Sequence, residues 1–427
     1  MEGKEPMVKH ACNSRHPPNQ FPLMKQTSSK PIVNEPFPLP QRWGDAEIEL
    51  LSRAMRQQSL FYWKGPQTEA LYEAFRQHYP LKHLFPCSSG TASIHIALAS
   101  LKFQPGDEII VPCITDMGSV LGILHQQLVP VFVDIDPDSY NIDPGSTRRA
   151  ITPKTRAILP VHLCGNPCDM DSMMTIAREN QLVVVEDCAQ AWGARYQGEL
   201  VGLKGDLSCY SFNDFKHLSC GDGGMVAAND DKFGSSLSKW GDKCYNRVTG
   251  IRNPDELALN YRMSEPLSAI CTAQLGKHDD IVERRHRTGM LLHSLLEDIP
   301  GIIRTKIQSE DTHSFYNYIF RLDLDFFGVT RSPFAAALQA EGVNAEDGYI
   351  PDPIYRYDLF QNHNFYAGTW PIRDFGLTDM DYRKVKCPVA EEFLQDCIHM
   401  PLNEAMTEAY TEKVGLAIRT VAELFAP

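Results

Sequence analysis

Short apolar runs alternate with helix-like segments between residues 83 and 228, and this alternation restricts the fold more than any other feature of the chain. The runs DEIIVPC, VPVFVDI, ILPVHL, LVVVED, LSCYSF and GMVAAND have the length and composition of buried strands. Segments with apolar residues at helical spacing, such as ASIHIALASL and DMGSVLGILHQQ, separate several of them. Strands that alternate with helices usually pair in parallel, so we expect an α/β fold with helices on the faces of a mainly parallel sheet.

The pattern changes near Pro266, where one long helix is expected over PLSAICTAQLGKHDDIVERRHRTGMLLHSLLEDI. It leads into a second α+β segment that contains NYIFRLDL and CPVAEEFLQDCIHMPL. A chain of 427 residues is too long for one compact core. We therefore predict a large domain over residues 37–297 and a smaller C-terminal domain over residues 298–427.

Residues 1–36 precede these domains. The beginning of the chain is polar, interrupted by proline, and lacks the apolar stretch of a signal peptide. We expect an N-terminal extension that is poorly ordered or contacts a partner subunit, in a cytoplasmic protein. The net charge of −13 argues against binding to nucleic acid or to an anionic membrane. The 12 cysteines are scattered, which favours reduced thiols over disulfides or a metal site.

The first candidate for a ligand contact is Ser89-Gly90-Thr91, between a strand and a helix. A glycine at the beginning of a helix lets a ligand approach the backbone, and the free N–H groups there attract an anion. The Thr91 hydroxyl can add a donor. Taken alone, these residues more often mark an ordinary capped helix start, so the motif supports a ligand site only together with the others.

The second candidate is Asp187, which ends the strand VVVED. Parallel sheets bind ligands at the carboxyl ends of their strands. A dinucleotide-binding site would use an acidic residue in this way, but it needs an earlier G-x-G-x-x-G motif that the sequence lacks.

The third candidate pairs Ser211 with Lys216 in SFNDFKHLSCGDGG. A lysine at a strand end loses its proton more readily when it is buried, and it can then condense with an aldehyde. An isolated lysine in such a loop would more often lie on the surface. The GDGG turn precedes a strand rather than a helix, so we assign it a structural role. Asn260-Tyr261-Arg262 is the fourth motif and indicates nothing alone.

Taken in order, SGT, ED-x-A-Q, S-x4-K, GDGG and NYRMSE resemble the DegT/DnrJ/EryC1/StrS aminotransferases. PGDEIIVP, VPVFVDIDPDSYNID and CPVAEEFLQDCIHMPLNEAMT extend the similarity from about residue 37 to the C-terminus. The resemblance implies a fold-type-I enzyme that uses pyridoxal 5′-phosphate (PLP), with a mainly parallel seven-stranded sheet and a smaller α+β domain. It also implies a homodimer with shared active sites.

The resemblance assigns roles residue by residue. Lys216 is expected to form the Schiff base with PLP, Asp187 to meet the pyridine nitrogen, and Gln190 to donate to the ring hydroxyl. The expected phosphate ligands are Gly90, Thr91 and Ser211, with Asn260 from the partner subunit. The implied reaction moves an amino group from glutamate or glutamine to a keto sugar or keto cyclitol.

Two positions bear on this assignment. Asp116, in PCITDMGS, stands where the family usually has an aromatic residue stacked on the cofactor, so Met117 or another group would have to face the ring. Asp116 could accept a substrate hydroxyl or ammonium, or it could cap the next helix. A dehydratase branch of the family has histidine in place of the lysine, so Lys216 favours transamination. Another PLP reaction, such as dehydration or elimination, and a non-catalytic PLP sensor are the alternatives.

Two further groups are given structural interpretations. His162, in the strand PVHL, is expected in the core or behind the active site rather than as a base. The basic run ERRHR at residues 283–287 is expected to be a solvated helix face, with a docking site for a phosphorylated substrate as the alternative.

Overall fold

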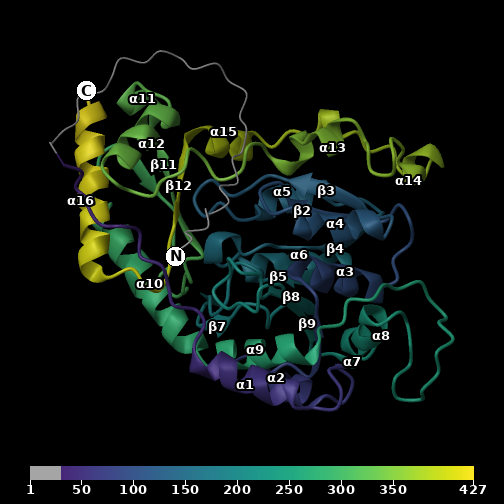
Figure 1. Cartoon of the computed structure of the whole chain (residues 1–427). Helices are drawn as coiled ribbons and strands as arrows, with labels where there is room; N and C mark the ends of the chain where they lie inside the picture. The colour runs from purple at the N-terminus through teal and green to yellow at the C-terminus, as the bar shows by residue number, and fades with distance from the viewer. Residues whose placement is uncertain (1–29) are drawn as a thin grey trace.

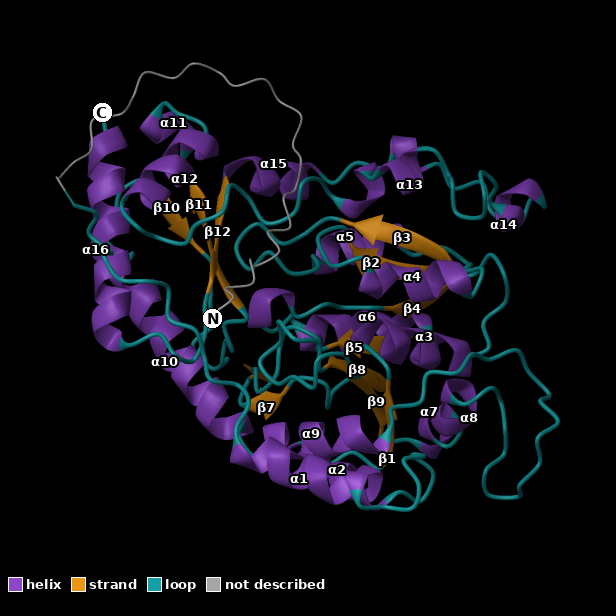
Figure 2. Ribbon diagram, in the orientation of Figure 1, coloured by secondary structure: helices purple, strands orange, loops and turns teal. Residues whose placement is uncertain are grey.

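The structure is a computed structural model and describes residues 30–427. A seven-stranded sheet with the order β1-β9-β8-β5-β4-β2-β3 forms its centre. Strands β8, β5, β4, β2 and β3 run parallel, and β9 is antiparallel to both of its neighbours. The strands are β1 (His83–Cys87), β2 (Glu108–Pro112), β3 (Val129–Val133), β4 (Thr155–Ile158), β5 (Val183–Asp187), β8 (Leu207–Ser211) and β9 (Gly224–Ala228). With helices packed around it (Figure 2), this sheet confirms the predicted fold class.

Helices between the strands cover the sheet. α3 (Gly90–Ser100) packs on β8 and β9 and against α4 (Gly118–His125). α5 (Pro144–Ala150) and α6 (Met170–Asn180) pack together and cover β3, β4 and β5. Every residue of β3, β8 and β9 is buried, as expected for strands that are covered on both faces.

Three helices, α1 (Asp45–Met55), α2 (Pro66–His78) and α9 (Glu265–Leu275), lie side by side below the sheet in Figure 1. Glu265 joins two of them, because its buried carboxylate accepts the backbone N–H groups of Gln67 and Thr68, each at 2.9 Å. These N–H groups belong to the first turn of α2 and have no partner within the helix.

The predicted single helix beyond Pro266 is wrong in one respect. The chain forms two helices, α9 and α10 (His278–Leu295), which meet at an angle at Gly276 and Lys277 (Figure 1). Glycine is a poor helix former, so Gly276 is a natural place for the break.

The predicted solvated face at residues 283–287 is confirmed for Glu283, Arg284 and Arg287, which are exposed. It is wrong for Arg285, which is 2% exposed. Its guanidinium donates to the Glu404 carboxylate at 2.9 Å and to the Leu402 carbonyl at 2.8 Å. A buried charge of this kind requires such partners. They lie more than a hundred residues further along the chain, so the local sequence gives no sign of them.

A second hydrophobic core surrounds an antiparallel sheet of β10 (Ile302–Arg304), β11 (Asn317–Leu322) and β12 (Cys397–Pro401). α12 (Arg331–Ala340) and α16 (Glu408–Phe425) cover it, and α10 packs along α16. In Figure 1, α16 forms the edge of the molecule beside this sheet.

Residues 353–387 leave the second core and return to the first. Tyr355, Phe360 and Tyr382 pack their rings around Phe132 of β3. The same segment carries α13 (Asp358–Gln361) and α14 (Pro371–Asp374), which Figure 1 shows beyond β3 and α4. α15 (Pro388–Asp396) then leads back to β12. The division of the chain near residue 297 stays a prediction.

Of the predicted N-terminal extension, residues 1–29 lie outside the described part. The following residues run along the second core, where Val33 is buried and its N–H donates to the Glu341 carbonyl at 2.9 Å.

No helix among residues 30–427 is long and apolar enough to cross a membrane. The remaining elements are β6 (Arg195–Tyr196), β7 (Glu199–Leu200), α7 (Asp231–Gly234), α8 (Leu237–Gly241), α11 (Leu324–Phe327) and the 3-10 turns Leu163–Gly165, Ile354–Arg356 and Tyr382–Lys384.

Candidate active site

Apart from Asn260, the predicted site residues lie at one edge of the seven-stranded sheet. Asp187 ends β5 and Ser211 ends the parallel neighbour β8, so both lie at carboxyl ends. Lys216 follows β8 in a loop, and Gln190 follows β5. Lys216 is close enough to Asp187 for its charge to influence that carboxyl. Parallel strands bring their carboxyl ends together, which explains how motifs far apart in the sequence converge here.

Asp187 is a buried carboxyl that is only partly satisfied by the protein. The Ser119 hydroxyl donates to Oδ2 at 2.7 Å, and the Ala189 N–H donates to Oδ1 at 3.0 Å. Ser119 in turn lies 2.7 Å from the Thr115 hydroxyl. Burial raises the pKa of Asp187 above its usual value, while these two donors and Lys216 oppose that shift. A cationic partner at this position would stabilise the ionised carboxylate.

Lys216 is half-buried and lies against an aromatic ring. Its Nζ is 4.3 Å from the centroid of Tyr316, in the loop before β11. Its backbone carbonyl accepts a hydrogen bond from the Arg42 guanidinium at 2.6 Å. The lysine therefore has neighbours from an earlier and a later part of the chain, Arg42 and Tyr316, contrary to the interpretation of a freely solvated loop residue.

Hydrogen bonds to Cys164 and Tyr349 orient the Gln190 side chain. Its Oε1 accepts the Cys164 N–H at 2.8 Å, and its Nε2 donates to the Tyr349 hydroxyl at 3.1 Å. Burial raises the pKa of the Tyr349 hydroxyl well above its usual value, so this group stays protonated. Cys164 has a left-handed backbone with φ of 54°, which is uncommon for a residue with a side chain.

The beginning of α3 forms a cradle of small groups. Ser89 caps the helix by accepting the Ala92 N–H at 3.0 Å. A Cβ on Gly90 would lie 2.8 Å from the Ser211 Cβ, and one on Gly118 would lie 2.7 Å from the Thr91 hydroxyl. Only glycine fits at these two positions. Gly90, Thr91 and Ser211 thus lie together beside a helix N-terminus of the kind that binds phosphate.

Asp116 fits both of the interpretations offered for it. Its Oδ1 accepts the Gly118 N–H at 2.7 Å, at the beginning of α4, and the residue is exposed. Burial raises the pKa of Tyr357, and the nearby Asp116 carboxylate adds to that effect. The side chain therefore accepts a hydrogen bond from the first residue of α4 and also lies near Tyr357 of residues 353–387. Met117 is half-buried and packs against the first core.

Asn260 is exposed, and within residues 30–427 its neighbours are Asp242, by a backbone bridge, and Arg262, whose N–H lies 3.5 Å from the Asn260 Oδ1. This placement separates Asn260 from the hydrogen bonds around Lys216 of the same chain. Its assignment to a neighbouring site stays a prediction.

His162 is buried behind the site, as the sequence predicted. Its Nδ1 accepts the Cys168 N–H at 3.0 Å, so the proton is on Nε2, which donates to Glu186 at 3.0 Å. Glu186 also accepts the backbone N–H groups of Gly202 and Lys204. The pair fixes a loop and does not reach the site.

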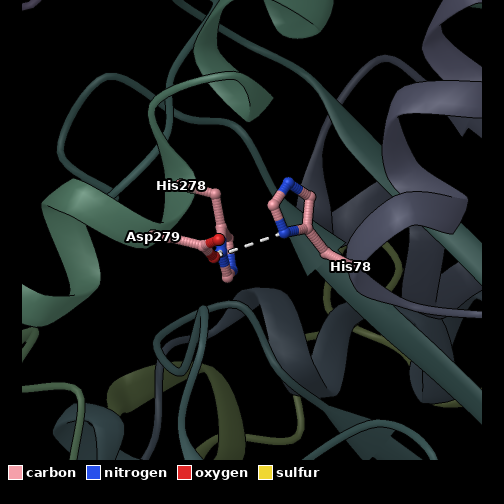
Figure 3. A group of neighbouring side chains, drawn as sticks. All are labelled: His78, His278 and Asp279. Carbon is pink, nitrogen blue, oxygen red and sulfur yellow. Dashed lines mark hydrogen bonds and ion pairs between the residues drawn. The ribbon is translucent and has the colours of Figure 1, made fainter.

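A second histidine cluster joins α2 to α10 (Figure 3). The Asp279 carboxylate lies 2.7 Å from the His278 Nδ1 and 3.4 Å from the His78 Nδ1. The other ring nitrogens face a carbonyl and a tyrosine hydroxyl, since His78 Nε2 lies 3.2 Å from the Leu275 oxygen and His278 Nε2 lies 3.5 Å from Tyr79. Because each ring nitrogen already faces a protein group, we interpret the cluster as a structural contact between the two helices.

Four residues of the site escaped the sequence analysis: Ser119, Cys164, Tyr316 and Tyr349. Ser119 lies in the first turn of α4, four residues after Thr115 in the preceding bend, so no helical spacing indicated the pair. The other three have no local pattern, because their neighbours come from distant segments.

A lysine, a buried carboxyl and a helix N-terminus lie together at the carboxyl edge of a mainly parallel sheet, an arrangement that agrees with an aminotransferase of the α/β class. The chain belongs to the DegT/DnrJ/EryC1/StrS aminotransferase family, whose sequence model matches residues 42–419.

Relatives and solved structures agree with this membership. A protein of Streptoalloteichus tenebrarius assigned as an L-glutamine:3-amino-2,3-dideoxy-scyllo-inosose aminotransferase is 34% identical, over 86% of this chain and 89% of its own. GDP-perosamine synthase of Caulobacter vibrioides is 30% identical, over 82% of this chain and 88% of its own. The structure of 3-amino-5-hydroxybenzoic acid synthase matches with a TM-score of 0.80 and 26% identity, covering 92% of this chain and all (100%) of the other. An aminotransferase from Psychrobacter cryohalolentis matches at 0.81 and 25%, over 91% and 100%.

Proposed function

We propose that this aminotransferase uses PLP and holds it on Lys216. The observation that carries the proposal is the convergence of Lys216, Asp187 and Gln190 beside the cradle at Gly90. The donor set fits the cofactor group by group: a buried carboxyl for the pyridine nitrogen, an amide for the ring hydroxyl, and a helix N-terminus for the phosphate. When bound, PLP supplies an electron sink for the bond-breaking step at the amino carbon.

The residues of the chain supply binding and proton transfer. Asp187, held by Ser119 and Ala189, keeps a proton on the ring nitrogen by its negative charge. Lys216 would hold the cofactor, and its Nζ, when free, would take up and return the proton at the amino carbon of the substrate. Gly90, Thr91 and Ser211 bind the phosphate, and Asn260 acts in the site of the partner subunit of a homodimer.

We infer that the acceptor is a keto sugar or keto cyclitol and that glutamate or glutamine is the donor. The names of the Streptoalloteichus and Caulobacter relatives support this class, since one refers to a cyclitol and the other to a GDP-linked sugar amine. Asp116, Tyr349 and Tyr357 offer the acceptor and donor groups that a polyhydroxylated substrate needs. A site with such groups rejects analogues that lack the hydroxyls, because its polar groups would stay unpaired.

The cofactor assignment is tested by borohydride reduction of the purified protein. We expect the protein to be yellow and PLP to become fixed to the peptide that contains Lys216, as detected by mass spectrometry. Lys204, on the same chain but outside the site, is the internal control. Labelling of another lysine, or of none, contradicts the assignment.

The substrate class is tested in half-reactions. The enzyme is first converted to its amino form with glutamate or glutamine, and a panel of ketones is then offered while the cofactor absorbance is followed. Keto sugars and inososes are expected to restore the original spectrum, and simple 2-oxo acids other than the product of the donor are expected to react poorly. Fast reaction with general 2-oxo acids and none with polyhydroxy ketones would leave an aminotransferase of a different substrate class.

A further inference from the structure

The loop that carries Tyr316 is built into the active site from the C-terminal part of the chain. The Tyr316 N–H donates to the Cys164 carbonyl at 2.8 Å, and the Ser314 N–H donates to the Gly165 carbonyl at 2.9 Å. A Cβ on Gly165 would lie 2.9 Å from the Phe315 backbone nitrogen and 3.1 Å from that of Tyr316, so the two segments touch backbone to backbone. The position of Tyr316 relative to Lys216 is therefore fixed by main-chain contacts.

Two features show that this placement has an energetic cost. Phe315, directly before Tyr316, has φ of 48°, and Cys164 on the facing segment has φ of 54°. Left-handed backbone at residues with side chains is unfavourable and gathers at functional sites. Arg285, fully buried, donates at 3.4 Å to both the Phe315 and the Tyr316 carbonyl and stabilises the turn.

The face of the Tyr316 ring lies 4.3 Å from the Lys216 Nζ. An aromatic face attracts a cation at this distance, more strongly where water is excluded. Among the described residues, the charge of Lys216 influences the Asp187 carboxyl, the Cys164 thiol and the His217 imidazole. Burial raises the pKa of Cys164 to about 12 and lowers the pKa of His217 well below its usual value, so both are neutral at neutral pH.

We propose that Tyr316 is a positioning residue for Lys216: its ring face holds the Nζ in the site and stabilises the protonated amine. The proposal deepens the proposed function, in which Lys216 must take up a proton and later release it. The ring favours the protonated amine, but it binds that amine less tightly than a carboxylate would. Lys216 can therefore still return to the cofactor. The Arg42 guanidinium does not compete, because it binds the backbone carbonyl of Lys216.

The test uses the full-length protein freed of cofactor, so it does not depend on turnover. Only the unprotonated amine reacts with an acylating reagent, and the rate of Lys216 labelling is followed against pH by peptide mass spectrometry. Tyr316→Leu removes the aromatic face and is expected to move the midpoint of this profile down by about half to one pH unit. At neutral pH, Lys216 then reacts about three- to tenfold faster. Tyr316→Phe keeps the face and is expected to stay within about twofold of the parent.

The controls separate the charge effect from simple exposure. A more open site would raise the rate at every pH without moving the midpoint, and that result overturns the proposal. Phe233→Leu removes the same type of contact from Lys232, whose Nζ lies 4.6 Å from the ring centroid, and should leave Lys216 unchanged. Tyr316→Met, which keeps an apolar side chain, replaces Tyr316→Leu if that variant does not fold. If Tyr316→Phe behaves like Tyr316→Leu, the hydroxyl rather than the ring carries the effect and the proposal fails, while the aminotransferase assignment stands.

Discussion

At the scale of single residues, the site depends on a carboxyl that the fold keeps away from water. Asp187 is 3% exposed, and burial raises its pKa. An acid with a raised pKa in the folded state binds its proton more tightly there than in the unfolded chain. The contribution of Asp187 to stability therefore falls as the pH rises through the folded-state pKa. A bound cationic group offsets this loss of stability. The Asp187 carboxyl therefore serves function but destabilises the protein that lacks its cofactor.

This relation gives opposite predictions for function and stability in Asp187→Asn. The neutral amide cannot hold a proton on the ring nitrogen, so we expect the rate of amino transfer to fall by about two orders of magnitude or more. The cofactor-free variant should melt at a higher temperature than the cofactor-free parent at neutral pH, and the difference should shrink as the pH is lowered. Activity within a few-fold of the parent would refute the role of the charge.

Ser119 offers a second residue-scale prediction. Ser119→Ala removes the 2.7 Å hydrogen bond to Asp187, which we expect to lower the rate about tenfold and to weaken PLP binding. Ser119→Thr keeps the hydroxyl and should recover most of both. PLP affinity from absorbance titration provides a readout independent of turnover. Equal loss in both variants would indicate a packing role instead.

At the scale of elements, the beginning of α3 combines a cap with an anion cradle. Gly90→Ala places a Cβ 2.8 Å from the Ser211 Cβ, so the helix start and β8 must move apart. We expect PLP affinity to fall at least tenfold while the far-ultraviolet spectrum stays that of the parent. Gly44→Ala, whose nearest neighbour would be 4.0 Å away, is the matched control. Unchanged affinity for free phosphate and PLP in Gly90→Ala would exclude the cradle.

The elements also show how far the sequence alone could predict the molecule. The strands of the first sheet were predictable because covered parallel strands are nearly all apolar. Asp187 and Lys216 were predictable because Asp187 ends one such strand and Lys216 lies in the loop that follows another. Arg285 and Tyr316 were not, because contacts far along the chain decide their burial and their neighbours. The break at Gly276 was missed because the apolar spacing continues on both sides of it.

At the scale of the whole molecule, the proposed homodimer can be tested by mixing subunits. Lys216→Ala and Asn260→Ala are each expected to be nearly inactive alone. A heterodimer of the two has one site with both residues intact, so exchange should restore up to about a quarter of the parental activity in an equal mixture. Subunit exchange is verified by native mass spectrometry. No recovery after verified exchange would show that Asn260 does not act across subunits.

The return of residues 353–387 to the first core has a consequence for synthesis. A ribosome delivers the chain from its N-terminus, so Phe132 and its strand emerge more than two hundred residues before Phe360 and Tyr382, which cover them. Until then the nascent protein carries an exposed aromatic surface at the edge of its sheet. Completion of the first core thus waits until Tyr382 has been translated, and a chain that stops before Tyr355 is expected to expose this aromatic surface and to aggregate.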